Sequence, residues 1–336
     1  MSMEARSHTT EGLKRNVGRL STVIVAVLIG IPAGHAAGYP EKPVRWVIPS
    51  TPAGATDKVT RMVQPRLAEY LGQPVVTDNR PGATGNIGAE HVARSAPDGY
   101  TVLTVIGSHA SNAALGQKIP FDLMRDFTPV SLIAIAPSVL IGHPALPASG
   151  VKQLVALIKA HPKRFEYASG GIGSIQHMSM ELLLTMTGQK MLHIPYKATH
   201  PALMDVIAGH VPLMVIATAS ALPQARAGRV RAYGVTSAKR MTAAPDIATI
   251  AEQGLPGYEA VQWFGMLLPA GTPKEVTAKL HAGLTVVLKE PQLQKLFVAD
   301  GVEPAPSATP EEFGVFIRAE LLKWAKVVKT AGITAQ

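Results

Sequence analysis

The chain has 336 residues, a formal net charge of +9 and no cysteine, which excludes disulfide bonds, a thiol nucleophile and a thiolate metal site. Its length predicts about two domains with a sizeable hydrophobic core. The positive charge favours anionic ligands through steering, although many basic proteins have no such ligand. Nucleic acid is not expected as a partner, because the basic residues are scattered and aromatic residues make up only 5% of the chain.

Residues 1–36 have the layout of a cleavable secretory signal peptide. An apolar core at residues 20–34 leads into Gly34-His35-Ala36, whose small residues have the right spacing for cleavage before Ala37. The basic residues that precede this core are Arg6, Lys14, Arg15 and Arg19. A membrane anchor is the weaker alternative, because the apolar run is shorter than the ~20 residues that a span needs.

Short β-branched segments then alternate with helix-period segments. Strands are expected at residues 43–49, 74–79, 100–106, 138–144, 165–170, 190–196, 211–217, 229–237 and 260–270. Helices are expected at residues 57–71, 87–95, 149–162, 174–187 and 200–209, and the chain beyond residue 270 is expected to be helical. The last helix has Thr309 as its N-cap, Pro310 in its first turn and Gly332 as its C-cap. This alternation predicts parallel sheets covered by helices.

Three loops at strand-to-helix positions are rich in small residues: "STPAGATD" (50–57), "VIGSHASN" (105–112) and "SGGIGSIQH" (169–177). In an open parallel sheet, ligands bind beyond the carboxyl ends of the strands. Small side chains let a ligand approach the unpaired N–H groups of the first helical turn, which favour negative charge. The loops therefore predict an anion site; the alternative is that their glycines only permit tight turns.

The polar candidates around these loops are Asp57, Asn79, His109, His177, Tyr196 and Lys197. Asp57 lies in a first helical turn, where capping alone explains it, and a ligand contact is the alternative. Each histidine could donate to a carboxylate or orient its own turn. Lys197 could supply a cation or be a solvated surface lysine.

Catalytic motifs are missing from the sequence. It contains no G-x-S-x-G, no H-E-x-x-H, no Walker A motif and no dinucleotide fingerprint. We therefore expect no enzymatic activity, no cofactor and no metal. An exported hydrolase that uses His109 or His177 as a base is kept as the least favoured hypothesis.

The chain resembles the substrate-binding receptors of tripartite tricarboxylate transporters, also called Bug receptors. The segments that carry this resemblance include "YPEKPVRWVIPSTPAGATD", "NRPGATGNIGA", "SAPDGYT" and "HIPYKATHPALMDVIAGHV", and it extends over essentially the whole chain after residue 36. The resemblance implies two Rossmann-like α/β domains of the periplasmic binding protein type, with a central ligand cleft and two crossing strands near residues 138–143 and 259–266. Domain 1 would comprise residues 37–138 and 263–336, and domain 2 residues 139–262.

The resemblance also implies which residues bind the ligand, a small organic carboxylate held by main-chain amides and hydroxyls. In domain 1 these are Thr51, Ala53, Gly54, Ala55, Thr56 and Asp57, with Ser108 and His109 beside them. In domain 2 they are Ser169, Gly170, Gly171, Ser174, Gln176, Tyr196 and Lys197.

Five positions depart from the family pattern. Ser50 replaces a usual aromatic residue, Ala53 a usual glycine, and Pro212 and Ile216 stand where aspartates are frequent. Ala113 follows Asn112 where proline is usual. These departures weaken any transfer of ligand identity.

The implied function is that of a monomeric periplasmic receptor that delivers its ligand to membrane permease subunits. The alternative within the family is a ligand sensor that signals through a two-component kinase.

Overall fold

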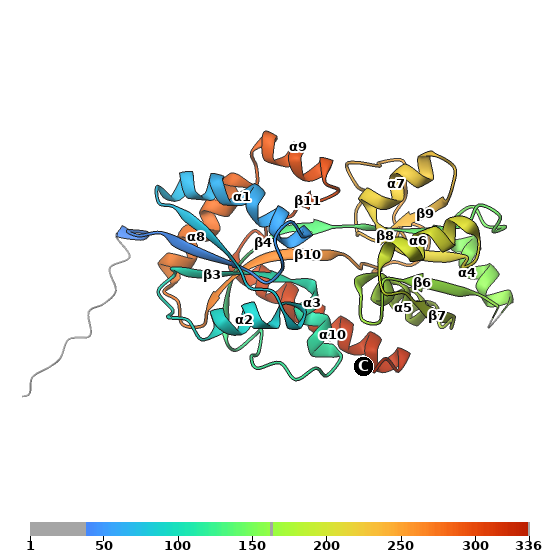
Figure 1. The fold of residues 1–336 in the computed structure, drawn as a ribbon, viewed down its shortest axis with the longest axis horizontal. Helices are drawn as coiled ribbons and strands as arrows, with labels where there is room; N and C mark the ends of the chain where they lie inside the picture. The colour runs from blue at the N-terminus through green and yellow to red at the C-terminus, as the bar shows by residue number, and fades with distance from the viewer. Residues whose placement is uncertain (1–37, 162–163, 335–336) are drawn as a thin grey trace, which may run out of the picture. The chain divides into compact units, whose positions relative to one another are not determined.

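The computed structural model describes residues 38–161 and 164–334, and Figure 1 shows the arrangement of its helices and strands. The predicted signal peptide at residues 1–36 lies outside the described residues. The strands form two sheets, one of six strands and one of five. Within the described ranges, no helix has both the length and the hydrophobicity needed to cross a bilayer.

The six-stranded sheet has the order β11-β4-β10-β3-β1-β2. Its strands are β1 (Val44–Ile48), β2 (Val75–Asn79), β3 (Thr101–Ile106), β4 (Phe127–Ala136), β10 (Gln262–Pro269) and β11 (Glu303–Pro304). β1 pairs in parallel with β2 and β3, whereas β10 is antiparallel to β3 and β4. The carboxyl ends of β1 and β3 therefore lie at the same edge of the sheet.

The five-stranded sheet has the order β7-β6-β8-β5-β9. Its strands are β5 (Ser138–Gly142), β6 (Glu166–Ser169), β7 (Leu192–Pro195), β8 (Leu213–Ala217) and β9 (Arg231–Val235). β6 is parallel to β7 and β8, while β5 is antiparallel to β8 and β9. The chain enters this sheet at Pro137, between β4 and β5, and returns to the six-stranded sheet between β9 and β10.

Successive side chains along the strands of the six-stranded sheet point to opposite faces, and helices cover both faces. In β3, Val102 and Ile106 pack into one apolar cluster and Leu103 and Val105 into another. The first cluster is covered by α1 (Ala55–Leu71), α8 (Lys274–Val287) and α9 (Pro291–Ala299), and the second by α2 (Asn86–Ala93), α3 (Gly107–Ala114) and α10 (Pro310–Ala331). A short 3₁₀ helix, η2 (Ala83–Gly85), precedes α2.

The five-stranded sheet is covered in the same way. Val139 and Ile141 of β5 pack with α6 (Thr199–Ala208) and α7 (Thr218–Arg226). Leu140 points to the opposite face, where α4 (Val151–Ala160) and α5 (Ile175–Thr187) lie. The central strands β5 and β8 therefore bury both faces, as their nearly continuous apolar sequences predict, whereas the edge strand β7 is partly exposed.

Helix α10 joins the cores of the two sheets. It packs on β4 and α3 and also on α5, so the apolar cluster beneath it includes residues of both sheets. Its buried Glu320 accepts hydrogen bonds from the indole N–H groups of Trp263 on β10 (3.0 Å) and of Trp324 (2.9 Å). Lys323 pairs with Glu320 and donates to the carbonyl oxygen of Glu259 (2.9 Å). These contacts fix α10 to the segment that connects the two sheets.

The expected α/β fold is confirmed, with four differences. Residues 105–112 do not form a loop, because β3 continues to Ile106 and α3 begins at Gly107. Strand β4 and helix α7 were not predicted, and the chain beyond residue 270 is not wholly helical, because it contains strand β11. The sheets are mixed rather than parallel, because the strands next to both crossings run antiparallel to their neighbours.

The contact between β10 and α10 yields a stability prediction. A methyl group at Gly265 of β10 would overlap the ring of Phe313, which is fully buried. We expect Gly265→Ala to lower the free energy of unfolding by about 1–3 kcal/mol through overpacking. Gly314→Ala on α10 is the matched control: its methyl group would lie 3.4 Å from Pro129, and helix propensity favours alanine by about 0.5–1 kcal/mol. Urea denaturation measures both, and equal stabilities of the two variants would contradict this account of the packing.

Candidate functional site

The loops expected to bind a ligand follow strands whose carboxyl ends share an edge. In the six-stranded sheet, α1 begins after β1 and α3 after β3. In the five-stranded sheet, α5 follows β6 and residues 196–198 follow the parallel β7. The N–H group of Tyr196 donates to the carbonyl oxygen of Ser169 (3.0 Å), which places these two segments of the five-stranded sheet side by side.

The first loop is shaped by Asp57, which is 3% exposed. Its carboxylate accepts hydrogen bonds from the N–H of Ala53 (2.9 Å), Nε of Arg61 (2.9 Å) and Nδ2 of Asn79 (2.8 Å). Burial would raise the pKa of Asp57, but these hydrogen bonds outweigh it and hold the pKa below its usual value. Asp57 is therefore committed to the protein, and so is Asn79, which also donates to the carbonyl oxygen of Ser50 (3.0 Å).

The start of α1 remains available to a ligand. Its N-cap, Gly54, provides no side-chain hydrogen bond, so the N–H groups of Ala55, Thr56 and Asp57 have no cap. Thr51, Ala53 and Ala55 are exposed, whereas the side chain of Thr56 is buried. Ala53 adopts a positive φ of 64°, where glycine is usually found. The network around Asp57 holds this residue in the left-handed conformation.

Ser108 and His109 lie in the first turn of α3. His109 is fully buried; its Nδ1 accepts from the N–H of Ile106 (3.1 Å), and its Nε2 faces the Gly85 backbone without completing a hydrogen bond. Burial lowers the pKa of His109 to about 4, so the imidazole is neutral at physiological pH. His109 thus orients the turn, while Ser108 stays partly exposed.

The second loop is organised by two stacked histidines. The rings of His177 and His193 lie 4.0 Å apart, and His193 also stacks on Tyr167. Nδ1 of His177 accepts from the N–H of Gly173 (3.1 Å), and Nε2 of His193 lies 2.7 Å from Oγ of Ser169. Burial lowers the pKa of His177 to about 3 and of His193 to about 4. Both rings are therefore neutral supports of the loop.

Several donors of the second loop are already used within it. Oγ of Ser169 accepts from the N–H of Gly171 (3.0 Å), and Oγ of Ser174 caps α5 by accepting from the N–H of His177 (3.3 Å). The N–H groups at the start of α5, those of Ile175 and Gln176, receive no such cap. Gly170 lies against Thr199, and a side chain there would overlap its hydroxyl.

Tyr196 and Lys197 follow β7, and only one of them has a side chain that is free for the expected ligand contact. The hydroxyl of Tyr196 donates to Asp205 of α6, which raises the pKa of Tyr196 to about 12. Lys197 is exposed, and it makes no ion pair with any residue that the structure describes. Of the two, only Lys197 has a polar group that a ligand could reach without breaking an existing hydrogen bond.

A cavity of about 330 Å³ lies between the starts of α3 and α5. On the α3 side it is lined by Gly107, Ser108, Ser111 and Asn112. On the α5 side it is lined by Ile172, Gly173, Ser174, Ile175 and Met178. Among the described residues, none of those lining the cavity carries a charged side chain. An anion in this cavity would have to be held by backbone N–H groups and hydroxyls.

The structure brings only part of the predicted set to this cavity. Ser108 and Ser174 line it, whereas residues 51–57, Tyr196 and Lys197 do not. Sequence reasoning missed Thr84, Gln262 and Trp324, which line it from η2, β10 and α10. Thr84 lies in "NRPGATGNIGA", one of the segments that carry the family resemblance. No sequence motif around Gln262 or Trp324 predicts a role in binding, because only the fold brings β10 and α10 to the cavity.

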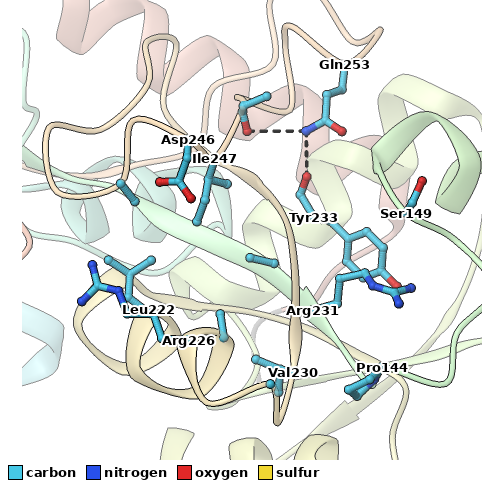
Figure 2. Close-up of a pocket in the computed structure, with 15 residues that line it drawn as sticks. Pro144, Ser149, Leu222, Arg226, Val230, Arg231, Tyr233, Asp246, Ile247 and Gln253 are labelled. Carbon is cyan, nitrogen blue, oxygen red and sulfur yellow. Dashed lines mark hydrogen bonds between the residues drawn. The ribbon is translucent and has the colours of Figure 1, made fainter.

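A larger cavity of about 670 Å³ lies elsewhere, among α7, β9 and residues 244–253 (Figure 2). None of the predicted site residues lines it. Its Arg231 is partly used by the protein, because Nη1 donates to the carbonyl oxygen of Leu146 (2.9 Å). The smaller cavity between two helix N-termini is therefore the better candidate site.

The described residues include no group of three or more histidine, aspartate or glutamate side chains arranged to hold a metal ion.

The role of Asp57 can be tested by removing its carboxylate. Asp57→Ala leaves three donors without their acceptor, so we expect a loss of about 2–4 kcal/mol in the free energy of unfolding, more than the ~1 kcal/mol of simple capping. Because the folded-state pKa is lowered, this stabilisation is present above the ordinary carboxyl pKa and is lost as the pH falls through the lowered value. Denaturation of the wild type and of Asp57→Asn between pH 7 and pH 2 measures it.

Asp246→Ala is the control for this experiment, because Asp246 is exposed. Its stability should match that of the wild type. A loss at Asp57 no larger than that of the control would refute the network's structural role.

The family model described as "Tripartite tricarboxylate transporter family receptor" matches residues 59–333. Protein BugT of Bordetella pertussis is 35% identical over 324 residues, which cover 94% of this chain and 98% of BugT. These matches confirm the resemblance inferred from the sequence.

Solved structures of similar proteins agree with the fold. Rpa4515 of R. palustris, solved with adipate, is 37% identical with a TM-score of 0.70, and the match covers 88% of this chain and 99% of Rpa4515. MatC of Rhodopseudomonas palustris, solved with bound malate, is 30% identical with a TM-score of 0.66, covering 86% of this chain and all of MatC. The chain belongs to the tripartite tricarboxylate transporter family of receptors.

Proposed function

We propose that this chain is a periplasmic receptor that captures a small organic carboxylate in the cleft between its two sheets and delivers it to a membrane permease. The observation that carries the proposal is the cavity between the starts of α3 and α5, which offers helix N-termini and hydroxyls from both sides. The solved relatives that hold adipate and malate support a carboxylate as the ligand class.

The energies of hydrogen bonds and helix N-termini are large enough for such a site to bind a carboxylate without a cationic side chain. A hydrogen bond to a charged group contributes about 1.5–3 kcal/mol, and a helix N-terminus about 0.3–2 kcal/mol. A micromolar complex needs about 8 kcal/mol. Several hydrogen bonds from the two sides of the cleft reach this value.

We also propose that the two sheets mark two domains, with residues 37–138 and 263–336 in domain 1 and residues 139–262 in domain 2. The passage of the chain between the sheets at Pro137 and before β10 supports this division. The uncapped start of α1 does not line the cavity in this structure. Hinge closure would bring residues 51–57 to the ligand and complete its binding site.

In this proposal the expected residues have two kinds of role. The amides at the starts of α1 and α5 hold the carboxylate, Ser108 and Ser174 line the cavity beside it, and closure would bring the partly exposed Gln176 and the exposed Lys197 toward it. Ser169, Gly170, Gly171, Asp57, His109 and Tyr196 hold the loops in shape through their own contacts.

Thermal melting of the chain from residue 37 onward tests the ligand class. Dicarboxylates, tricarboxylates, aromatic acids and amino acids are added singly, with an uncharged polyol as the control. We expect at least one carboxylate to raise the melting midpoint, since a ligand at 100 times its Kd stabilises the native state by about 2.7 kcal/mol. If only uncharged compounds shift the midpoint, the proposed function is wrong.

Gly54→Val tests the contribution of α1. Cβ at this position would lie 3.4 Å from the carbonyl oxygen of Thr51, so the fold accommodates it. The branched side chain would cover the first amides of the helix, and we expect at least about a hundredfold weaker binding of the carboxylate found above, corresponding to about 2.7 kcal/mol. Gly54→Ala should lie between the wild type and the valine variant. Unchanged affinity in Gly54→Val, measured by calorimetry, would remove α1 from the site.

A further inference from the structure

The floor of the cleft cavity is apolar. Met178 of α5, Trp324 of α10 and Val261 before β10 all line the cavity and are 1%, 2% and 2% exposed. The indole N–H of Trp324 is bonded to Glu320, so the ring offers only its apolar surface. A ligand that reaches this floor meets side chains that cannot form a hydrogen bond with it.

The walls add further apolar surface. Leu115 lines the cavity at the end of α3, and its side chain lies 3.0 Å from where a Cβ of Gly173 would stand, across the cleft. Ile172 is 39% exposed at the tip of the second loop and also lines the cavity. Ile172 thus adds apolar surface at the edge of the cavity.

Four polar side chains around the cavity form hydrogen bonds within the protein, and the amide side chains of Gln117 and Gln262 line it as well. Oγ of Ser108 donates to the carbonyl oxygen of Thr84 (3.3 Å), and Oγ of Ser111 to that of Ser108 (3.2 Å). Nδ2 of Asn112 donates to Oγ1 of Thr84 (2.7 Å), and Oγ of Ser174 to the carbonyl oxygen of Gly171 (2.7 Å). These hydrogens are already used within the protein, although the oxygens can still accept from a ligand hydroxyl. Discrimination against hydroxylated acids therefore comes from the apolar surface of the cavity rather than from these groups.

We propose that the cleft selects carboxylates whose body between or beyond the charged groups is apolar, and that it rejects hydroxylated acids of the same size. This inference rests on the proposed function, because it takes a carboxylate as the ligand. The uncapped amides hold the charge, and Leu115, Met178 and Trp324 contact the carbon skeleton. The volume of about 330 Å³ lies at the small end for ligand cavities, which range over about 300–1,000 Å³. The ligand is therefore a short aliphatic or single-ring acid.

Calorimetric titration with a matched pair of ligands tests the selection. Adipate and galactarate have the same six-carbon chain and the same two carboxylates, but galactarate carries four additional hydroxyl groups. We expect adipate to bind at least about tenfold more tightly, because hydroxyls that enter an apolar environment lose their hydrogen bonds to water. Equal or tighter binding of galactarate overturns the inference and leaves the proposed function standing. Binding of neither these nor any other carboxylate overturns both.

Leu115→Asn tests the apolar wall itself. The change keeps the size of the side chain and introduces a polar group. We therefore expect adipate binding to weaken about tenfold and the ratio of the adipate affinity to the galactarate affinity to become smaller. Leu322→Asn is the matched control, because Leu322 is 68% exposed on α10 and does not line the cavity. It should leave both affinities unchanged.

The melting midpoint of each variant without ligand shows whether it has folded. If Leu115→Asn fails to fold, Leu115→Ala serves instead, with the same narrowing of the ratio expected. If the ratio of the adipate affinity to the galactarate affinity stays at its wild-type value in the folded variant, the role of Leu115 and the inference with it are overturned.

Discussion

Because none of the described residues that line the cavity carries a charged side chain, an anion bound there would depend on backbone N–H groups and hydroxyls. A backbone donor cannot be moved by choosing another rotamer, so the geometry of the loops decides where the negative charge binds. This constraint explains the chemistry of the loops. Asp57, His109, His177 and His193 all use their polar atoms to fix the backbone at a helix start. These four ionisable residues support the backbone donors.

The first loop shows how such a support compensates for an unfavourable conformation. A positive φ at a residue with a side chain costs about 1–2 kcal/mol, and Ala53 has a φ of 64°. Its N–H group donates to the buried Asp57, whose carboxylate also joins Arg61 and Asn79. One hydrogen bond to a charged acceptor is worth about as much as the strain, so the network holds the loop open at the start of α1. A glycine at this position would need less of that support.

Local signals predicted the parts of the fold that depend on local interactions. The N-cap Thr309 and the C-cap Gly332 lie where the sequence placed them, because capping involves residues within one turn. Strand β4 was missed because "FTPVSLIAIA" contains a proline and no regular alternation; it is stabilised by pairing with β10 and β11. Helix α3, "GSHASNAA", consists of small and polar residues, and its packing against α10 compensates for weak helix propensity. The loops could be located from sequence, but the cavity they line could not.

Trp324 connects the core of the protein to the candidate site. Its ring packs in the apolar cluster that spans both sheets, and the same ring closes the floor of the cavity. Glu320 joins it to Trp263 on β10, the strand that begins where the chain returns to the six-stranded sheet. Because interiors are close-packed, a shift of α5 relative to α3 has to be accommodated at this ring. The C-terminal helix is thus as much a part of the cleft as the glycine-rich loops, although it lies more than a hundred residues beyond them in the sequence.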